Sequence, residues 1–282
     1  MFALDLARPF HGVRVDARWA ASFGSRCEAM AARMKPEHFV SHATAARLHG
    51  LPLPVRLERE LDVHVSSFAP VRPPRVVGVV GHSANPARVA IVEADGLRAV
   101  SPSLAWCQLS ATLTLDELIV AGDRLLGRPR PIATPLEIAE AVRAFGQSPG
   151  CRRLRAAVAL IRERVESPRE TLLRLALIRA SLPEPEVNAP IVNSQGRKIA
   201  IGDLVYPAAK ILVEYDGEQH RTDNRQYGRD VVRLNDIAAE GWLTIRVDKH
   251  MTFDEACVRT RRALLSRGGL HDSWSPQNGR NA

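Results

Sequence analysis

Three carboxylates in the stretch from Arg197 to His220 are spaced as if they shared one site. The alternation of apolar and polar residues there predicts two short strands joined by a loop at 206–209. Residues two apart on a strand share a face, so Glu214 and Asp216 are expected to point to the same side of the sheet. Asp203, on the preceding strand, is the third candidate.

The predicted four-residue loop also sets the pairing of the two strands. With this loop, Val205 pairs with Lys210, and Asp203 pairs with Leu212. Asp203 then lies on the same face as Glu214 and is its diagonal neighbour, at roughly 7–8 Å between Cα atoms. A loop with an odd number of residues would instead turn Asp203 to the opposite face.

Carboxylates gathered on one face repel one another unless a cation lies among them. A hard divalent ion with oxygen ligands meets that need. We therefore expect Asp203, Glu214 and Asp216 to hold Mg²⁺ or Mn²⁺, which can stabilise the attacking and leaving oxygens of an in-line attack on phosphate. The structural alternative is a solvent-facing acidic stripe on an amphipathic hairpin.

The same residues carry a resemblance to a nuclease superfamily. Asp203, the string E-Y-D-G-E-Q-H at 214–220 and S-P-R-E at 167–170 resemble the PD-(D/E)xK nucleases, and more closely their bacterial branch related to very-short-patch mismatch endonucleases. The resemblance covers about residues 167–265 and implies a restriction-endonuclease-like fold and metal-dependent DNA hydrolysis. Asp216 stands where the superfamily pattern has a lysine, which related repair enzymes also lack.

Two further residues join the candidate site through this resemblance, which implies catalytic roles for Glu170 and His220. A histidine here can orient water or protonate the leaving group. Each residue has a structural explanation as well. Ser167 and Glu170 fit a capping box at the start of a helix, and His220 fits a polar residue of a loop.

Three arginines are candidates for contacting DNA phosphates. Arg229 and Arg233 are four residues apart on the helix predicted after the site, so they share a face. Arg246, on the next predicted strand, is expected beside the site. The alternative for the two helical arginines is surface pairing with Asp230 and Asp236.

Composition favours a polyanionic partner. The 282-residue chain has a formal net charge of +8 and a pI of about 9.9, which suits DNA, although a high arginine content explains the same numbers. Aromatic residues make up 5% of the chain, so stacking on bases is not expected to dominate binding.

Several classes of protein are not favoured by the sequence. The four cysteines are far apart and form no C-x-x-C motif, so neither a zinc site nor a disulfide framework is expected from them. No apolar run approaches the roughly 18 residues that span a bilayer. The N-terminus lacks the layout of a signal peptide, so we expect a cytoplasmic protein without a membrane partner.

The order of predicted elements indicates a two-domain α/β protein. We place an N-terminal α+β domain at 1–150, a linker at 146–150, a nuclease-like domain at 151–267 and a disordered tail at 268–282. The C-terminal domain is predicted as helix, three strands, helix, strand and helix. Its strand–helix–strand passage predicts a parallel crossover and a mixed sheet with helices on its faces.

The N-terminal half is predicted to begin with two short helices, at 26–35 and 42–49. Ser25 and Glu28 fit a capping box for the first, and Ser41 fits the N-cap of the second. A plain helical hairpin is favoured over a helix-turn-helix. Strands and amphipathic helices follow, with clear helical patterns at 115–126 and 135–145.

Two segments of this half resemble the AbiEi-type antitoxins of type IV toxin–antitoxin systems. They are F-V-S-H-A-T-A-A-R-L-H-G-L-P-L-P at 39–54 and G-L-R-A-V-S-P-S-L-A-W-C-Q-L at 96–109, and the match covers about residues 36–127. The resemblance implies DNA binding and repression of the protein's own operon. The winged helix expected ahead of Ser41 is not evident.

Two functions of different classes follow. The first is a Mg²⁺- or Mn²⁺-dependent DNA endonuclease acting in defence or repair. The second is a non-catalytic DNA-binding antitoxin or regulator with a degenerate nuclease-like half and a cognate toxin or defence protein as partner. A structural protein without catalytic function is the third alternative.

Overall fold

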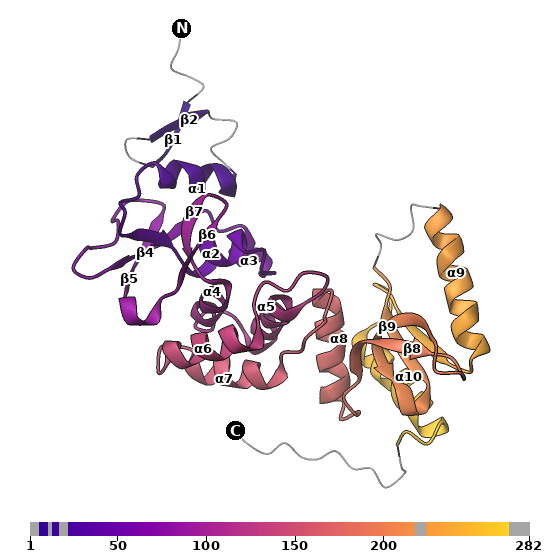
Figure 1. The fold of residues 1–282 in the computed structure, drawn as a ribbon. Helices are drawn as coiled ribbons and strands as arrows, with labels where there is room; N and C mark the ends of the chain where they lie inside the picture. Colours follow the sequence, from indigo (N-terminus) through magenta and orange to yellow (C-terminus); the bar gives the residue numbers. More distant parts are fainter. Residues whose placement is uncertain (1–5, 11–12, 17–21, 218–223, 271–282) are drawn as a thin grey trace. The chain divides into compact units, whose positions relative to one another are not determined.

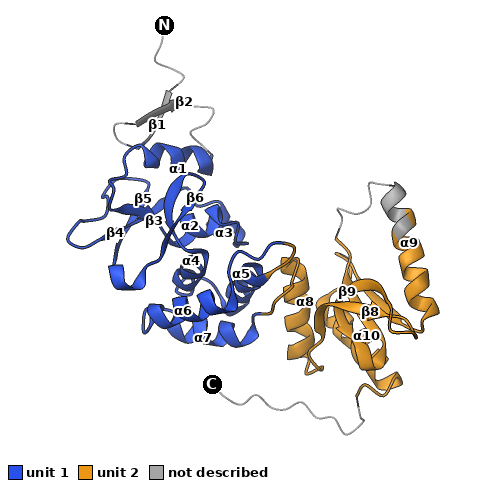
Figure 2. Cartoon of the chain, in the orientation of Figure 1, with its two compact units in different colours: residues 1–126, 130–161 blue, residues 127–129, 162–282 orange. Residues whose placement is uncertain are grey.

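The computed structural model describes residues 6–10, 13–16, 22–217 and 224–270. The chain divides into two compact units (Figure 2). Unit 1 comprises residues 1–126 and 130–161, and unit 2 comprises residues 127–129 and 162–282.

The boundary between the units differs from the sequence-based prediction, because helix α7 (Cys151–Leu160) belongs to unit 1. The expected linker at 146–150 ends in a packed turn. Gly150 has a φ of +88°, and a Cβ there would lie 2.4 Å from the carbonyl carbon of Ser110. This glycine is required by a close approach of two backbones rather than by a need for flexibility.

The α/β class predicted from the sequence is confirmed. The structure contains a five-stranded and a four-stranded mixed sheet flanked by helices (Figure 1). A separate two-stranded antiparallel ribbon consists of β1 (Leu6–Phe10) and β2 (Val13–Asp16). Among the described residues, no helix combines the length and apolar character needed to cross a membrane.

The sheet of unit 1 has the strand order β5-β4-β3-β7-β6. It is mixed because β4 runs parallel to β5 and β3 runs parallel to β7, whereas the other pairs are antiparallel. Its strands are β3 (His38–Val40), β4 (Val63–Phe68), β5 (Val79–Ala84), β6 (Ile91–Ala94) and β7 (Leu97–Val100).

The helices of unit 1 pack their apolar faces inward, and Trp106 of α4 is fully buried. Helices α5 and α6 have the bounds that their periodicity predicted. Before α7 the helices are α1 (Phe23–Ala31), α2 (His42–Leu48), α3 (Val55–Glu58), α4 (Pro102–Leu109), α5 (Leu115–Leu126) and α6 (Pro135–Phe145), with a 3-10 turn η1 (Pro86–Arg88).

The predicted helical hairpin near the N-terminus is wrong. Strand β3 lies between α1 and α2, and all three of its residues are buried. Helix α1 also starts earlier than predicted, because Ser22 rather than Ser25 is the N-cap and its Oγ accepts the backbone N–H of Ser25 at 3.2 Å. The short segment 38–40 is too brief to show a period, so its strand character follows from pairing with β4.

Unit 2 follows the predicted order of elements. Its sheet order is β11-β10-β9-β8, and β10 and β11 are parallel, as the predicted crossover requires. The elements are α8 (Pro168–Arg179), β8 (Glu186–Val192), β9 (Lys198–Tyr206), a 3-10 turn η2 (Pro207–Ala209), β10 (Ile211–Tyr215), α9 (Asn224–Ala239), β11 (Leu243–Val247) and α10 (Phe253–Ser266).

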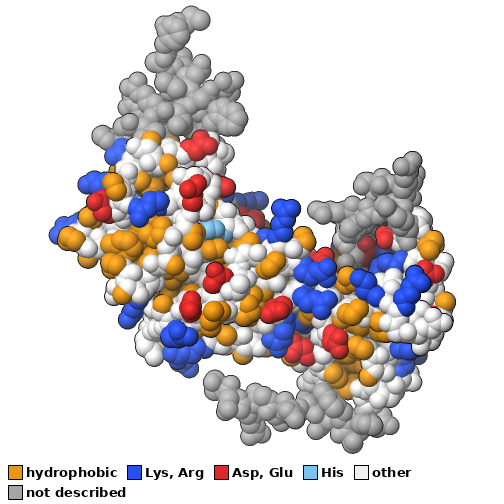
Figure 3. All heavy atoms as spheres, viewed as in Figure 1, with side chains coloured by type: hydrophobic (Ala, Val, Ile, Leu, Met, Phe, Trp, Pro, Cys, Tyr) orange, Lys and Arg blue, Asp and Glu red, His pale blue; other side chains and the backbone are white. Residues whose placement is uncertain are grey.

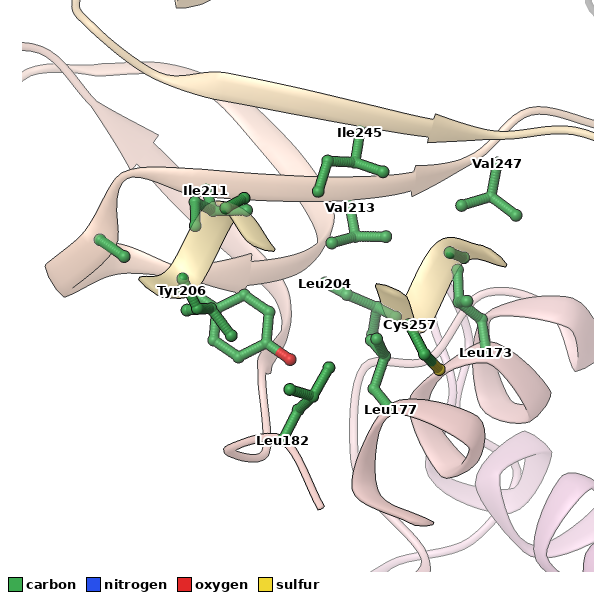
Figure 4. Packing of buried hydrophobic residues seen from close by; sticks show 14 of the residues in the cluster. Leu173, Leu177, Leu182, Leu204, Tyr206, Ile211, Val213, Ile245, Val247 and Cys257 are labelled. Atoms are coloured by element: carbon green, nitrogen blue, oxygen red, sulfur yellow. The ribbon is translucent and has the colours of Figure 1, made fainter. Parts of the chain in front are cut away.

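Apolar side chains cover both faces of this sheet. On one face, the cluster in Figure 4 joins Leu204, Val213 and Ile245 of the strands to Leu173 of α8 and Cys257 of α10. On the other face, a smaller cluster includes Val205, Leu212 and Ile237 of α9. The larger cluster extends to Leu270, which is buried although the sequence predicted a disordered tail from 268. Residues 271–282 of that tail lie outside the described residues.

The central hairpin has a different register from the predicted one. Tyr206 pairs with Ile211 and Val205 pairs with Leu212, so the predicted pairings Val205–Lys210 and Asp203–Leu212 are wrong. The turn uses residues 207–210, and Lys210 adopts a φ of +48°. Because the register differs by an even number of residues, the predicted sharing of faces is retained.

Candidate functional site

The carboxylates singled out by the sequence meet in one pocket of unit 2. This pocket has a volume of about 240 Å³. It is lined by four carboxylates, two arginines and two further side chains: Asp203, Glu214, Asp216, Asp230, Arg233, Arg246, Tyr215 and Leu234. Asp230 is an addition, since the sequence offered it only as a surface partner for the helical arginines.

Asp203 occupies an irregular point of the sheet. The pairing of β8 with β9 includes Val187–Leu204 and Ala189–Gly202 but omits Asn188 opposite Asp203. Asn188 has a φ of +43°, a left-handed conformation that asparagine tolerates better than most residues. This break is a single unpaired position rather than a β-bulge, because the offset of the two strands is the same on both sides of it.

The strands change faces across this break. Val187 and Leu204 pack in the larger cluster, whereas Ala189 packs in the smaller one. Gly202 is needed on the smaller-cluster side, because a Cβ there would lie 2.3 Å from Cδ1 of Leu212. The sequence therefore positions Asp203 through a glycine before it and an asparagine opposite it.

The carboxyl of Asp203 is destabilised as an anion. Burial is the main reason, and the nearby Glu170 and Glu214 add to it, so that the pKa of Asp203 rises from 3.8 to about 7. The backbone N–H of Tyr215 donates to Oδ2 of Asp203 at 2.9 Å and opposes the shift, as does the charge of Arg233. Asp203 is thus a carboxyl that changes charge near neutral pH.

Glu214 is paired with Arg233 by two parallel hydrogen bonds. Nη1 donates to Oε1 at 2.8 Å and Nη2 donates to Oε2 at 3.0 Å. The Glu214 side chain is 10% exposed and that of Arg233 is 33% exposed. Arg233 therefore points from α9 into the site, and the partner found for it is Glu214 rather than the predicted Asp230 or Asp236.

Asp216 follows β10 directly and is paired with Arg246. Nη2 of Arg246 donates to Oδ2 of Asp216 at 2.5 Å. Arg246 lies beside Glu214 in the parallel ladder of β10 and β11, so the crossover brings it to the site as expected. Its side chain is 51% exposed, which leaves part of the guanidinium open to solvent.

Glu170 lies close to the pocket without lining it. Ser167 caps helix α8 as predicted, because its Oγ accepts the backbone N–H of Glu170 at 3.2 Å. The carboxylate of Glu170 does not complete the capping box in the predicted way. Its Oε2 accepts from the backbone N–H of Glu166 at 3.0 Å and from Nδ2 of Asn188 at 2.9 Å. Glu170 thus ties the helix to the break beside Asp203.

Two predicted site residues cannot be placed. His220 lies outside the described residues, and Arg229 lies in α9 with a side chain that the structure does not describe.

The donors in the pocket suit a hard divalent cation, since carboxylate oxygens are the ligands that Mg²⁺ and Mn²⁺ prefer. The nearby Glu170 and Glu214 add to the effect of burial in raising the pKa of Asp203, so a cation beside Asp203 would stabilise its charged form. The observed geometry is not closed around an ion: among the described residues, only His42, His64 and His82 form a group whose ligand atoms all lie within 4.8 Å of one another. Arg233 and Arg246 instead neutralise the charges of Glu214 and Asp216.

The three histidines were missed at the sequence level. They come from α2, β4 and β5, and no spacing motif joins them. The four cysteines, whose spacing gave no sign of a metal site, are free thiols.

The comparisons with known proteins give no family. No protein-family model matches the chain, and searches of curated proteins and of solved structures found no match. The geometry of the two units therefore carries the functional argument alone.

Proposed function

We propose that unit 2 is a metal-dependent DNA endonuclease domain of the PD-(D/E)xK type. The observation that carries this proposal is that Asp203, Glu214 and Asp216 line one pocket. Arg233 and Arg246 line the same pocket and form ion pairs with Glu214 and Asp216. Three oxygen-donor side chains beside two arginines match what phosphodiester hydrolysis needs, namely sites for cations and for a phosphate.

Each residue has a distinct part in this proposal. Asp203, Glu214 and Asp216 would hold Mg²⁺ or Mn²⁺, which would stabilise the attacking and leaving oxygens and lower the pKa of the attacking water. Arg246, half exposed beside Asp216, binds a DNA phosphate. Glu170 is a positioning residue, since it bonds Asn188 opposite Asp203 and its charge acts on Asp203.

Arg233 has to share Glu214 with the cation. Its Nη1 also lies 3.4 Å from the carbonyl oxygen of Ile201, so the guanidinium keeps a backbone acceptor if one carboxylate oxygen is withdrawn. A carboxylate offers about four lone-pair sites and can serve both partners.

A specific observation favours a second function. The two-point pair of Glu214 with Arg233 already neutralises a carboxylate that a nuclease needs for metal. An arginine-filled site fits a non-catalytic DNA-binding regulator, in which unit 1 acts as an AbiEi-like antitoxin domain with a cognate toxin or defence protein. On the face of each unit shown in Figure 3, described Lys and Arg side chains are interspersed with Asp and Glu.

Both functions place the chain with DNA in the cytoplasm. Unit 1 would supply DNA or partner binding and unit 2 would supply either hydrolysis or a second binding surface.

The experiment that separates them is nicking of supercoiled plasmid by the full chain with Mg²⁺ or Mn²⁺. Asp203→Asn and Glu214→Gln are the test variants. Glu186→Gln is the matched control, because Glu186 is an exposed carboxylate on the neighbouring strand β8 that does not line the pocket. The nuclease proposal expects metal-dependent nicking by the wild type and the control and its loss in both test variants.

Calorimetric titration with Mg²⁺ and Mn²⁺ decides the case in which no plasmid is cut. Binding of either ion by the wild type, with weaker binding by Asp203→Asn, supports a nuclease whose substrate differs from the plasmid. No binding with or without DNA would overturn the nuclease proposal and leave the regulator, which is then tested by binding of the protein to its own operator DNA.

A further inference from the structure

Three histidines from three separate elements of unit 1 meet at one point. His42 begins α2, His64 lies on β4, and His82 lies on β5. His64 and His82 are direct neighbours in the parallel ladder of these two strands. One ring nitrogen of each residue lies within 4.8 Å of the other two.

The distances match most of a three-histidine metal site. Nδ1 of His64 and Nε2 of His82 share a hydrogen bond of 3.0 Å. Two imidazole nitrogens on one tetrahedral zinc ion are about 3.3 Å apart, so an ion could replace this hydrogen bond with little movement of the two rings. The ring centroids of such ligands are about 5 Å apart. The ring centroid of His64 lies 5.2 Å from that of His82 and 5.6 Å from that of His42.

The third pair is closer than a bound ion allows. The rings of His42 and His82 are stacked with centroids 3.7 Å apart. An ion entering the cluster therefore has to turn the His42 ring away from His82. The stacked arrangement observed here is the metal-free alternative.

Hydrogen bonds outside the cluster orient two of the rings. Nε2 of His64 lies 3.3 Å from Oε1 of Glu60, and Nδ1 of His42 lies 2.9 Å from Oγ of Ser41. Ser41 is itself held by the hydroxyl of Ser66, which donates to it at 2.7 Å. Metal-bound histidines characteristically use their second nitrogen in this way. These bonds leave Nε2 of His42 for an ion, and an ion would take the place of the hydrogen bond between Nδ1 of His64 and Nε2 of His82.

The backbone at His42 is held in an uncommon conformation. Its φ is +51°, in the left-handed region that non-glycine residues rarely adopt. The backbone N–H of His42 donates to Oε1 of Gln108 at 2.8 Å, which fixes this conformation from α4. Strained residues of this kind persist where surrounding structure over-determines them, often at binding sites.

Burial, followed by the neighbouring histidines, lowers the pKa of His42 to about 3, and burial together with His64 lowers that of His82 to about 4. The surroundings of these two rings therefore disfavour the positively charged form.

We propose that His42, His64 and His82 bind one divalent transition-metal ion, with Zn²⁺ the best-fitting ion. Imidazole nitrogens favour Zn²⁺ over the hard ions Mg²⁺ and Ca²⁺. The ion would tie the start of α2 to β4 and β5 and stabilise unit 1. Three protein ligands leave a fourth position for water.

The test is a calorimetric titration of Zn²⁺ into the chelator-treated full chain. Excess Mg²⁺ is present to compete for the carboxylates of unit 2, so that Zn²⁺ binding there does not contribute to the measured heat. His82→Gln and His64→Gln are the test variants. His250→Gln is the matched control, since His250 is exposed and belongs to unit 2. We expect one ion per chain in the wild type and the control, and an affinity at least tenfold weaker in each test variant.

Two outcomes would overturn the proposal: no Zn²⁺ binding by the wild type, or equal binding by folded test variants. Visible absorption of Co²⁺ bound to the wild type covers the case in which the variants fail to fold. Strong bands of a four- or five-coordinate ion are expected, and weak octahedral absorption alone would refute the site. Neither measurement depends on nuclease activity.

Discussion

The histidine cluster of unit 1 and the carboxylate pocket of unit 2 both contain partly buried ionisable groups, but burial has opposite consequences for metal binding at the two places. Burial favours the neutral form in both, since it lowers the pKa of His42 and His82 and raises that of Asp203. A neutral imidazole is ready to bind metal, whereas a neutral carboxyl is not. Burial and the neighbouring rings together favour the neutral form of His42 and His82. The carboxylate pocket needs added positive charge instead, which Arg233 and Arg246 supply in this structure.

The largest expected effect separates the two sites by function. If unit 2 is the proposed endonuclease, Asp203→Asn should lower Mg²⁺-dependent nicking by about 10²-fold or more, because the change removes a proposed carboxylate ligand of the ion. His82→Gln should leave nicking unchanged. Plasmid nicking rates measure both, and equal losses in the two variants would end the distinction between the sites.

The next effect concerns the arginine that balances the pocket. Glu214→Ala should lower the free energy of unfolding by roughly 2–3 kcal/mol, because it leaves the half-buried guanidinium of Arg233 without its carboxylate. Glu255→Ala is the control, since its partner Arg259 is 56% exposed, and the change should stay within about 1 kcal/mol. Urea unfolding compares the two variants. Equal losses in the free energy of unfolding would show that burial does not make the Glu214–Arg233 pair more important for stability than an exposed pair.

The glycine beside Asp203 should matter through packing alone. Gly202→Ala should lower the free energy of unfolding by about 2 kcal/mol, because its Cβ would lie 2.3 Å from Cδ1 of Leu212. Gly228→Ala in α9 meets no atom within 4 Å, so it should be neutral or stabilising, as alanine favours a helix. Thermal unfolding tests both, and a harmless Gly202→Ala would contradict the close packing described.

The smallest effect is a pH dependence that distinguishes the pocket from the histidine cluster. The pKa of Asp203 is raised to about 7 in the folded chain, so the folded state holds an extra proton between about pH 4 and 7. Stability therefore falls as the pH rises through this window. Asp203→Asn removes this loss of stability, because an amide does not titrate. The amide oxygen can still accept the hydrogen bond from the backbone N–H of Tyr215.

The variant should accordingly be more stable than the wild type above pH 7, by about 1–2 kcal/mol because Asp203 is only half-buried, and equal to it near pH 4. Added Mg²⁺ should narrow the gap at pH 8 by stabilising the anion. Denaturant unfolding at several pH values checks this, and a constant difference between the two proteins would be evidence against the pKa shift.

Local patterns were enough to predict most elements of unit 2. The capped helix after Ser167, the hairpin and the parallel crossover all follow from signals within short windows of sequence. The face shared by Glu214 and Asp216 is predictable as well, because strand period is local. Unit 1 was harder, since β3 has only three residues and exists through its partners.

The sequence by itself determined that Asp203, Glu214 and Asp216 gather in unit 2, because their spacing along two adjacent strands fixes their faces. It could not decide the register of the hairpin, since Lys210 takes a left-handed conformation that shifts the turn. Only the tertiary structure brought Arg233 to Glu214 and joined His42, His64 and His82. These contacts link residues far apart in the chain, whose distances are set by how helices and strands pack rather than by any local pattern.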